Sequence, residues 1–157
     1  MITIDPQHAR LSGDETLPEV GLGLLLREAD QSFNRLLRGK LAEHGVTFGQ
    51  FQHLRHLWAE DGLTQVEISR RIGIEKASST SIVESLERAG WIARERDEAD
   101  RRKIRIVLTP EGRGLEARLW DCARDTNRVA AQGFKPAEMA ALFAGLTRVI
   151  ENLKAGR

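Results

Sequence analysis

WIARERDEADRRKIRIVLTPEG, which covers residues 91–112, contains two short runs of strand character on either side of a polar tip. The tip, residues 97–100, is bordered by arginines on its N-terminal side and by arginines and a lysine on its C-terminal side. On the second run Ile104, Ile106 and Leu108 recur at a spacing of two, so one face of the strand is apolar and the other is charged. The pattern predicts a β-hairpin with one buried face and a basic tip, a shape suited to a nucleic-acid groove.

Composition limits the class of protein. The length of 157 residues fits one domain, alone or with dimerising extensions, and 41% hydrophobic residues suffice for a packed core. No apolar run approaches the ~20 residues of a membrane span, and the first residues lack the apolar segment of a signal peptide, so we expect a cytoplasmic protein without a membrane partner. The single cysteine, Cys122, fits a reducing compartment. Because the net charge is only +1, any case for DNA binding depends on where the charges lie.

The chain before the hairpin reads as helices joined by short turns. Apolar residues recur at intervals of three and four over residues 18–45, which predicts a long amphipathic helix. Capping boxes at Thr47–Gln50 and Thr64–Glu67 predict the starts of two shorter helices. A turn at Gly73 then leads into a further helix over residues 76–89. Helix, short helix, turn, helix and hairpin together predict a winged helix-turn-helix.

Two more amphipathic stretches, opened by Pro110 and Pro136, complete the chain. Val66 in the short third helix and Val129 near the end of the fifth are expected on apolar inner faces. The expected fold class is mainly α with a small β-hairpin wing. It comprises a single domain of residues 1–157, with a winged region at 47–109 and terminal helices at 18–45 and 110–157.

The segment from about residue 47 to 112 resembles the MarR family of bacterial winged-helix regulators. The matching pieces are TFGQF at 47–51, LTQVEIS at 63–69, SLERAGW at 85–91, and DRR at 100–102 followed after five residues by LT at 108–109. The resemblance implies an obligate homodimer built from the terminal helices, which binds a pseudo-palindromic operator in double-stranded DNA. It further implies a repressor that a small-molecule effector, of an aromatic or phenolic-acid type, releases from DNA.

The helix after the turn is the expected recognition helix. Its candidate DNA-binding residues are Lys76, Ser78, Ser79, Thr80 and Ser81. Hydroxyls in the first turns of a helix can contact phosphates and base edges, although they also favour helix starts without any ligand. Helical geometry turns at least one of the four hydroxyls inward. Many similar sequences carry an arginine in place of Ser81, so this helix is expected to use more neutral contacts. Gln65 is either a phosphate contact or simply exposed.

In the hairpin, Arg102 is the best candidate for a minor-groove contact, and Asp100 is expected to orient it through a charge-assisted pair. The expected phosphate contacts are Arg94, Arg101 and Lys103. Arg105 lies further down the strand, where it can at best meet a phosphate. The alternative is a solvated turn, because the acidic residues of the tip nearly neutralise the basic ones.

An effector pocket is expected where the first, second and fifth helices meet. The candidate lining residues are Arg27, Phe51, His53 and Trp58, each of which is equally explained as core or surface. No metal site is expected, because His53 and His56 have no cysteine nearby to complete a zinc site. No nucleophile–base pair, phosphate loop or carboxylate pair is evident, so neither an enzyme nor a cofactor is expected.

Two rival functions remain open from the sequence. A winged helix can serve protein interaction instead of DNA binding, although such a module has no need for the basic hairpin tip. A thiol-based sensor acting through Cys122 is the other alternative. Cys122 lies within a terminal helix, and this position is more typical of a small packing residue.

Overall fold

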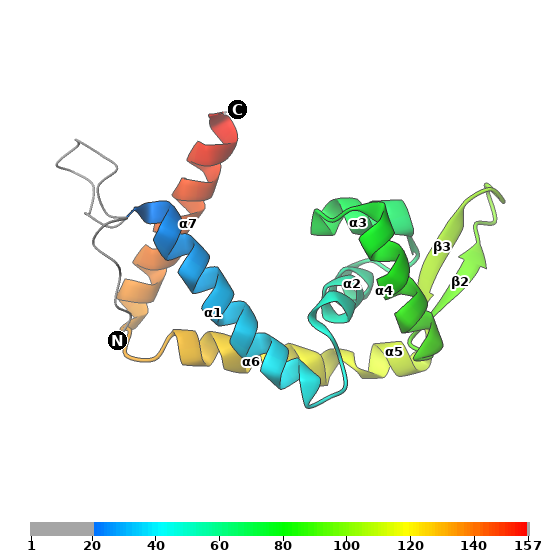
Figure 1. Cartoon of the computed structure of the whole chain (residues 1–157), viewed down its shortest axis with the longest axis horizontal. Coiled ribbons are helices and arrows are strands. Elements are labelled where there is room, and N and C mark those ends of the chain that lie inside the picture. Colours follow the sequence, from blue (N-terminus) through cyan, green and yellow to red (C-terminus); the bar gives the residue numbers. More distant parts are fainter. Residues whose placement is uncertain (1–20, 157) are drawn as a thin grey trace. The chain divides into compact units, whose positions relative to one another are not determined.

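The structure is a computed structural model that describes residues 21–156 (Figure 1). The elements in chain order are α1 (Leu22–Ala42), α2 (Phe48–Ala59), β1 (Leu63–Thr64), α3 (Gln65–Ile72), α4 (Lys76–Arg88), β2 (Ile92–Arg96), β3 (Ile104–Leu108), α5 (Pro110–Gly114), α6 (Glu116–Ala130) and α7 (Pro136–Ala155). The chain is thus mainly helical with one small sheet, which confirms the expected fold class. The predicted start of the first helix at residue 18 lies outside the described residues.

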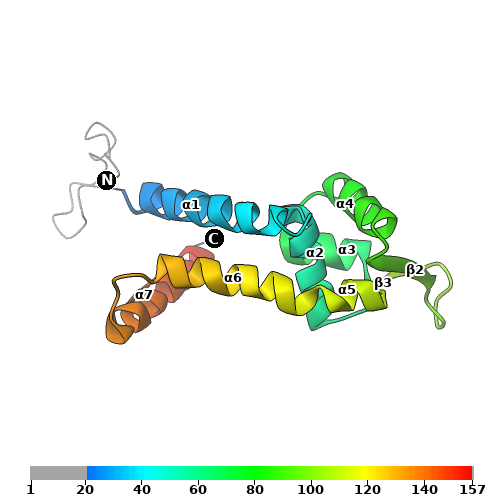
Figure 2. The same cartoon turned by 90° about the horizontal axis from the view of Figure 1, so that it is seen from below.

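The chain divides into two compact units, and the boundary falls inside α6 between Ala123 and Arg124. The first unit contains α1 to α5, the three strands and the first half of α6. The second contains the rest of α6 and α7. In the first unit the β2–β3 hairpin projects beyond the helices (Figure 2). None of the described helices is long and apolar enough to cross a membrane.

Both predicted capping boxes are present, and they fix where α2 and α3 begin. The Thr47 hydroxyl accepts the backbone N–H of Gln50 at 3.2 Å, while Gln50 Oε1 accepts that of Thr47 at 2.9 Å. Thr64 and Glu67 make the same reciprocal pair at the start of α3. The backbone of Gly73 is left-handed, with a φ of +78°, which ends α3 and turns the chain into α4. The helix-turn-helix prediction is therefore confirmed.

The sheet has three strands in the order β1-β3-β2, all antiparallel. The sequence predicted only the β2–β3 hairpin, so the third strand is a correction. β1 is two residues long, and Leu63 pairs with Ile106 while Thr64 pairs with Arg105. Two residues are too few to show an alternating pattern. This short strand fastens the base of the hairpin to the start of α3.

The core of the first unit draws one face from each element. Its buried residues are Leu37, Leu41, Val46, Phe51, Leu54, Leu57, Leu63, Ile68, Val83, Leu86, Ile92, Ile106, Leu108, Leu115, Leu119 and Cys122. Val66 is 47% exposed, contrary to prediction, because two residues of helix turn it about 200° away from buried Ile68. Ile104 is exposed because it lies at the outer end of β3, and Val129 is also exposed.

The hairpin is joined to the short helix α5 through a close backbone contact at Gly112. Its N–H donates to the Thr109 hydroxyl at 3.1 Å, and its carbonyl accepts the indole N–H of Trp58 at 3.0 Å. A Cβ atom at this position would overlap the carbonyl oxygen of Trp91 and approach its carbonyl carbon to 2.9 Å. Glycine is therefore the residue that this backbone approach permits.

We predict that Gly112→Ala lowers the free energy of unfolding by about 3 kcal/mol, the upper end of typical overpacking costs, because backbone cannot move aside as a flexible side chain can. Gly114→Ala is the matched control. No atom lies within 4 Å of a Cβ there, so the change should be neutral or stabilise by up to about 1 kcal/mol. Urea denaturation of both variants measures the difference, and equal stabilities would contradict the steric argument.

Candidate nucleic-acid interface

The first turns of α4 present part of the predicted hydroxyl set to solvent. Lys76, Ser78 and Ser81 are exposed, and Thr80 is half-buried. Ser79 is fully buried, so the prediction that it contacts DNA is wrong. The sequence predicted that one hydroxyl turns inward but could not say which, because a run of four small polar residues carries no apolar periodicity.

A polar bridge joins α3 to α4. Gln65 Nε2 donates to the Thr80 hydroxyl at 2.6 Å, and that hydroxyl donates to the carbonyl of Lys76 at 2.9 Å. The Ser81 hydroxyl donates to the carbonyl of Ser78 at 3.1 Å. The structure therefore brings together Gln65 and Thr80, two predicted DNA-binding residues, and fixes the direction of the Thr80 hydroxyl.

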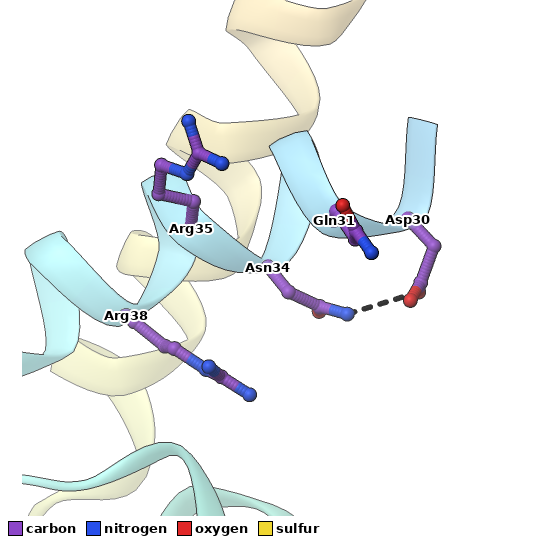
Figure 3. Close-up of a pocket in the computed structure, with 5 residues that line it drawn as sticks. All are labelled: Asp30, Gln31, Asn34, Arg35 and Arg38. Carbon is purple, nitrogen blue, oxygen red and sulfur yellow. Dashed lines mark hydrogen bonds between the residues drawn. The ribbon is translucent and has the colours of Figure 1, made fainter. Parts of the chain in front are cut away.

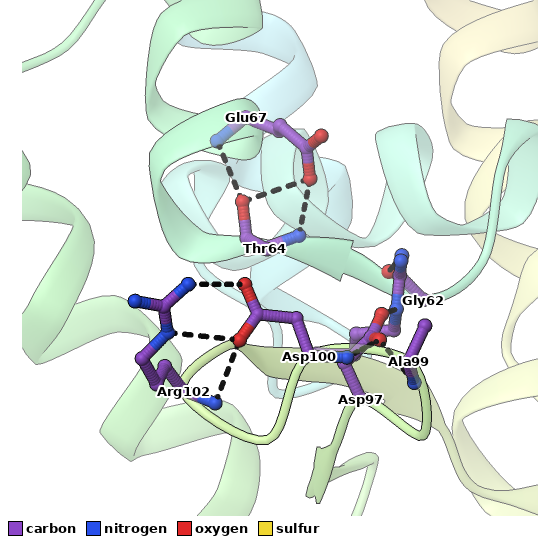
Figure 4. Close-up of polar contacts among 8 residues, drawn as sticks. Gly62, Thr64, Glu67, Asp97, Ala99, Asp100 and Arg102 are labelled. Atoms are coloured by element: carbon purple, nitrogen blue, oxygen red, sulfur yellow. Dashed lines mark hydrogen bonds and ion pairs between the residues drawn. The ribbon is translucent and has the colours of Figure 1, made fainter.

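The turn of the wing is organised by a buried carboxylate, Asp97, which is only 6% exposed. Its Oδ1 accepts the backbone N–H groups of Asp100 at 2.8 Å and Ala99 at 2.9 Å (Figure 4). Its Oδ2 pairs with Arg105 Nε. The bond from the Asp100 N–H, followed by that from Arg105, holds the pKa of Asp97 below its ordinary value of 3.8. Arg105 also donates to the carbonyl of Gly62 at 2.8 Å. Its guanidinium thus ties the wing to β1, a structural role that the sequence did not predict.

The predicted pair between Asp100 and Arg102 is present at the wing tip. Arg102 Nε lies 3.1 Å from Asp100 Oδ1 and Nη2 lies 3.4 Å from Oδ2, while the Arg102 side chain is 90% exposed (Figure 4). This pairing lowers the pKa of Asp100. Arg101 and Lys103 are exposed on the same tip. Arg94 lies 3.4 Å from Glu87 at the end of α4. Arg102 therefore presents an oriented cation to solvent.

A groove of about 460 Å³ separates the wing from the start of α3 and α4. Its lining residues are Thr64, Gln65, Val66, Glu67, Lys76, Arg102, Lys103, Ile104 and Arg105. Four predicted DNA-binding residues, Gln65, Lys76, Arg102 and Lys103, border this one groove. The arrangement can bind a polyanion through cations from two different elements.

The four predicted effector residues lie in different surroundings. Arg27 is exposed on α1, whereas Phe51 and His53 are buried in the core of the first unit. Phe51 packs edge-on against Trp58 and Trp120. Trp58 uses its indole N–H on the Gly112 carbonyl. Phe51 and His53 are thus corrected to core residues, since apolar periodicity alone does not distinguish a cavity wall from a packed interior.

The described residues hold no group of three or more potential metal ligands. Cys122 is buried in α6, where its thiol contacts the carbonyls of Arg118 at 3.5 Å and Lys40 at 3.8 Å. Burial of this kind is typical of a packing residue, because reactive thiols are accessible and lie in electropositive surroundings.

The hollows on α1 were not predicted from the sequence, and two of them share Arg38. The first, of about 420 Å³, is lined by Asp30, Gln31, Asn34, Arg35 and Arg38 (Figure 3). The second, of about 710 Å³, lies between α1 and α2 and is lined by Arg38, Ala42, Gly45, Val46, Thr47, Phe48 and Gly49. Arg38 borders both hollows, and its guanidinium lies 5.1 Å from the centre of the Phe48 ring. This second hollow combines a cation with an aromatic surface.

The fold and the interface define a winged helix-turn-helix protein. Residues 44–103 match the family model described as the MarR family. The chain is 38% identical over 98 residues to the HTH-type transcriptional regulator TtmR of Methylorubrum extorquens, which covers 62% of this chain and 50% of TtmR. It is 30% identical over 109 residues to the HTH-type transcriptional repressor YetL of Bacillus subtilis, covering 68% of this chain and 65% of YetL. The match thus spans about half to two thirds of these relatives.

Solved structures agree with the sequence comparisons. A MarR transcriptional regulator from Methanosarcina mazei superposes with a TM-score of 0.77 at 26% identity, over 87% of this chain and 98% of that one. BpsR of Bordetella bronchiseptica, whose DNA binding is described as regulated by 6-hydroxynicotinic acid, gives a TM-score of 0.73 at 28% identity, over 82% and 92%. Over residues 44–103 the chain therefore matches the MarR family, and the relatives named here are transcriptional regulators.

We predict that ionised Asp97 stabilises the wing at neutral pH. Because its folded pKa is depressed, this stabilisation is present above the ordinary value of 3.8 and is lost as the pH falls through the lower folded value. Asp97→Asn keeps an oxygen for the turn but loses the charge, so it should unfold at lower urea concentration at pH 7. The gap to wild type should close as the pH falls below 3.8. Glu98→Gln, at an exposed acid of the same tip, is the control, and a gap that persists in acid would contradict the assignment.

Proposed function

We propose that the protein is a homodimeric, sequence-specific DNA-binding regulator, most simply a repressor that a small ligand releases. The observation that carries this proposal is the groove flanked by α4 and the wing, where oriented polar and cationic groups face solvent from two elements. A module for protein interaction has no use for an exposed arginine held in place by a carboxylate. The match of residues 44–103 to the MarR family model supports the same function.

In the proposed complex α4 enters the major groove and the wing contacts the adjacent minor groove. Ser78 and Ser81 face base edges, and Lys76 meets phosphate. Arg102, aimed by Asp100, enters the minor groove, where a narrow A·T-rich stretch concentrates negative potential. The remaining phosphate contacts are Arg94, Arg101, Lys103 and Gln65.

A homodimer is supported by apolar side chains that each unit leaves exposed. In the second unit these are Leu142, Phe143, Leu146, Ile150 and Leu153 of α7, and in the first they include Leu22, Leu25 and Leu36 of α1. A row of this kind is more apolar than a solvated helix face needs to be. A second copy of the chain would cover both sets.

Selection from a random duplex library tests the DNA-binding proposal directly. The wild-type protein should enrich a pseudo-palindrome with half-site centres ~10 bp apart, and footprinting should protect both halves. Affinity should fall steeply with salt, because arginine and lysine contacts release counterions. The absence of any enriched sequence, or a single asymmetric footprint, would overturn the proposal of a dimeric sequence-specific regulator.

The sign of the change in DNA affinity distinguishes two roles of the wing: an oriented arginine contact and a diffuse positive surface. Asp100→Asn and Glu98→Gln each remove one negative charge from the same tip. If Asp100 aims Arg102, Asp100→Asn should weaken binding of the selected duplex by roughly 1 kcal/mol or more, in the range of a good groove contact. Glu98→Gln should leave binding unchanged or slightly tighter, because less negative charge faces DNA. Fluorescence anisotropy measures both, and tighter binding by Asp100→Asn would mean that the wing is only a diffuse positive surface.

For the effector, the hollow between α1 and α2 is better placed than the residues first expected. Arg38 can pair with a carboxylate while Phe48 offers a face to an aromatic ring. This chemistry fits an anionic aromatic ligand of about the size of 6-hydroxynicotinic acid, the compound named for BpsR. The site also adjoins Thr47 and Gly49 at the start of α2, so a ligand there touches the helix on which α4 rests.

We predict that a matching hydroxylated aromatic acid, with 6-hydroxynicotinic acid as the first probe, raises the melting temperature. A ligand at 100 times its dissociation constant adds ~2.7 kcal/mol of stability. Arg38→Gln should abolish most of the shift. Arg35→Gln is the control, since Arg35 lies on the same helix but does not line the second hollow. An equal shift in both variants would exclude this hollow as the effector site.

A further inference from the structure

One face of α2 forms a seat for α4 that consists of Gly49, Gln50 and His53. His53 is fully buried, and its two ring nitrogens lie 2.8 Å from the carbonyl oxygen of Gly49 and 3.0 Å from the hydroxyl of Ser79 in α4. Gln50 Nε2 donates to the hydroxyl of Ser85, also in α4, at 3.1 Å. Two polar links therefore join the helices inside an otherwise apolar core.

The donor and the acceptor of the His53–Ser79 hydrogen bond follow from the other partner of the imidazole ring, the carbonyl of Gly49. A carbonyl oxygen can only accept, so Nδ1 of His53 carries the proton that Gly49 receives. Burial lowers the pKa of His53, which favours the neutral ring, and its Nε2 is then an acceptor. The Ser79 hydroxyl must therefore donate to His53. The neighbouring hydroxyls of Thr80 and Ser81 instead donate to carbonyls of their own helix.

These links restrict movement that the apolar core alone would permit. Burial of Val83 and Leu86 is favourable but has no preferred direction, so it tolerates small slides and rotations of α4. A hydrogen bond does not, since its distance and angle limits are narrow. Sliding α4 by one residue moves it ~1.5 Å and turns its side chains by about 100°, which would break both links. Ile82 of α4 also packs closely on Gly49, because a Cβ added at Gly49 would lie only 2.9 Å from Cδ1 of Ile82.

We propose that His53 is a positioning residue of the recognition helix: through Ser79 it sets the register of α4 on α2. That register decides which hydroxyls, Ser78 and Ser81 among them, face the base edges. The inference rests on the proposed DNA-binding function for its consequence, operator discrimination, but its structural half stands without DNA.

The DNA-free arm compares crystal structures of the wild type and His53→Leu. The variant should show α4 shifted or rotated on α2, and amide exchange of α4 should be faster. His56→Leu is the control, because it removes a histidine from the same helix whose Nε2 has no partner among the described residues. An unmoved α4 in His53→Leu overturns the inference, whatever the protein does with DNA.

The DNA arm uses a duplex selected by the wild type and a scrambled duplex of the same composition. His53→Leu and Ser79→Ala should each reduce the ratio of the two affinities about tenfold, within the range of one lost base contact. The double variant should be no worse than either single variant, because both remove the same bond. His53→Gln, which can again accept from Ser79, should recover most of the ratio.

The ratio of the two affinities distinguishes a loss of helix positioning from a loss of protein stability. Loss of stability alone lowers the active fraction and so affects both duplexes equally, which leaves the ratio unchanged. An unchanged ratio in folded His53→Leu and Ser79→Ala overturns the positioning role. If the wild type selects no duplex, the proposed function fails, and the crystallographic comparison still decides the inference.

Discussion

The contact on which the rest of the first unit depends is the meeting of two backbones at Gly112. The base of the wing, α2 and the short helix α5 all meet there, and the bonds around Gly112 leave little freedom. The Thr109 N–H donates to the carbonyl of Trp91, and its hydroxyl donates to the carbonyl of Gly90. Asp61, just after α2, accepts the N–H of Leu108 and pairs with Arg113. The ends of both wing strands are thereby held against α5.

Acidic residues give the wing its shape, although its proposed ligand is a polyanion. Asp97 is buried and closes the turn, while Asp100 holds the guanidinium of Arg102. In both cases a carboxylate fixes the direction of groups around it, at the cost of some positive charge. This explains how a chain with a net charge of only +1 can present an oriented cationic surface. The position of charge, and not its total, defines the surface.

The sequence was sufficient for those features that are local. Capping boxes and left-handed glycines act within four or five residues, so the helix starts at Thr47 and Thr64 and the turn at Gly73 were all predicted. The missed features depend on contacts between distant segments. Two-residue β1 exists only because β3 lies beside it, and Arg105 is structural only because Gly62 comes close to it. Likewise, the buried position of Ser79 follows from His53 in another helix, and no local pattern marks the pair.

The neutral character of the exposed part of α4 has a further consequence for the proposed complex. Apart from Lys76, the groups that its first turns offer are hydroxyls, whereas arginine and lysine are concentrated on the wing. Counterions released on binding would then come mainly from the phosphates beside the wing. Ionic strength would change how much of the operator is occupied but hardly which operator is chosen. Such a regulator would bind the same set of operators when the ionic strength inside the cell changes.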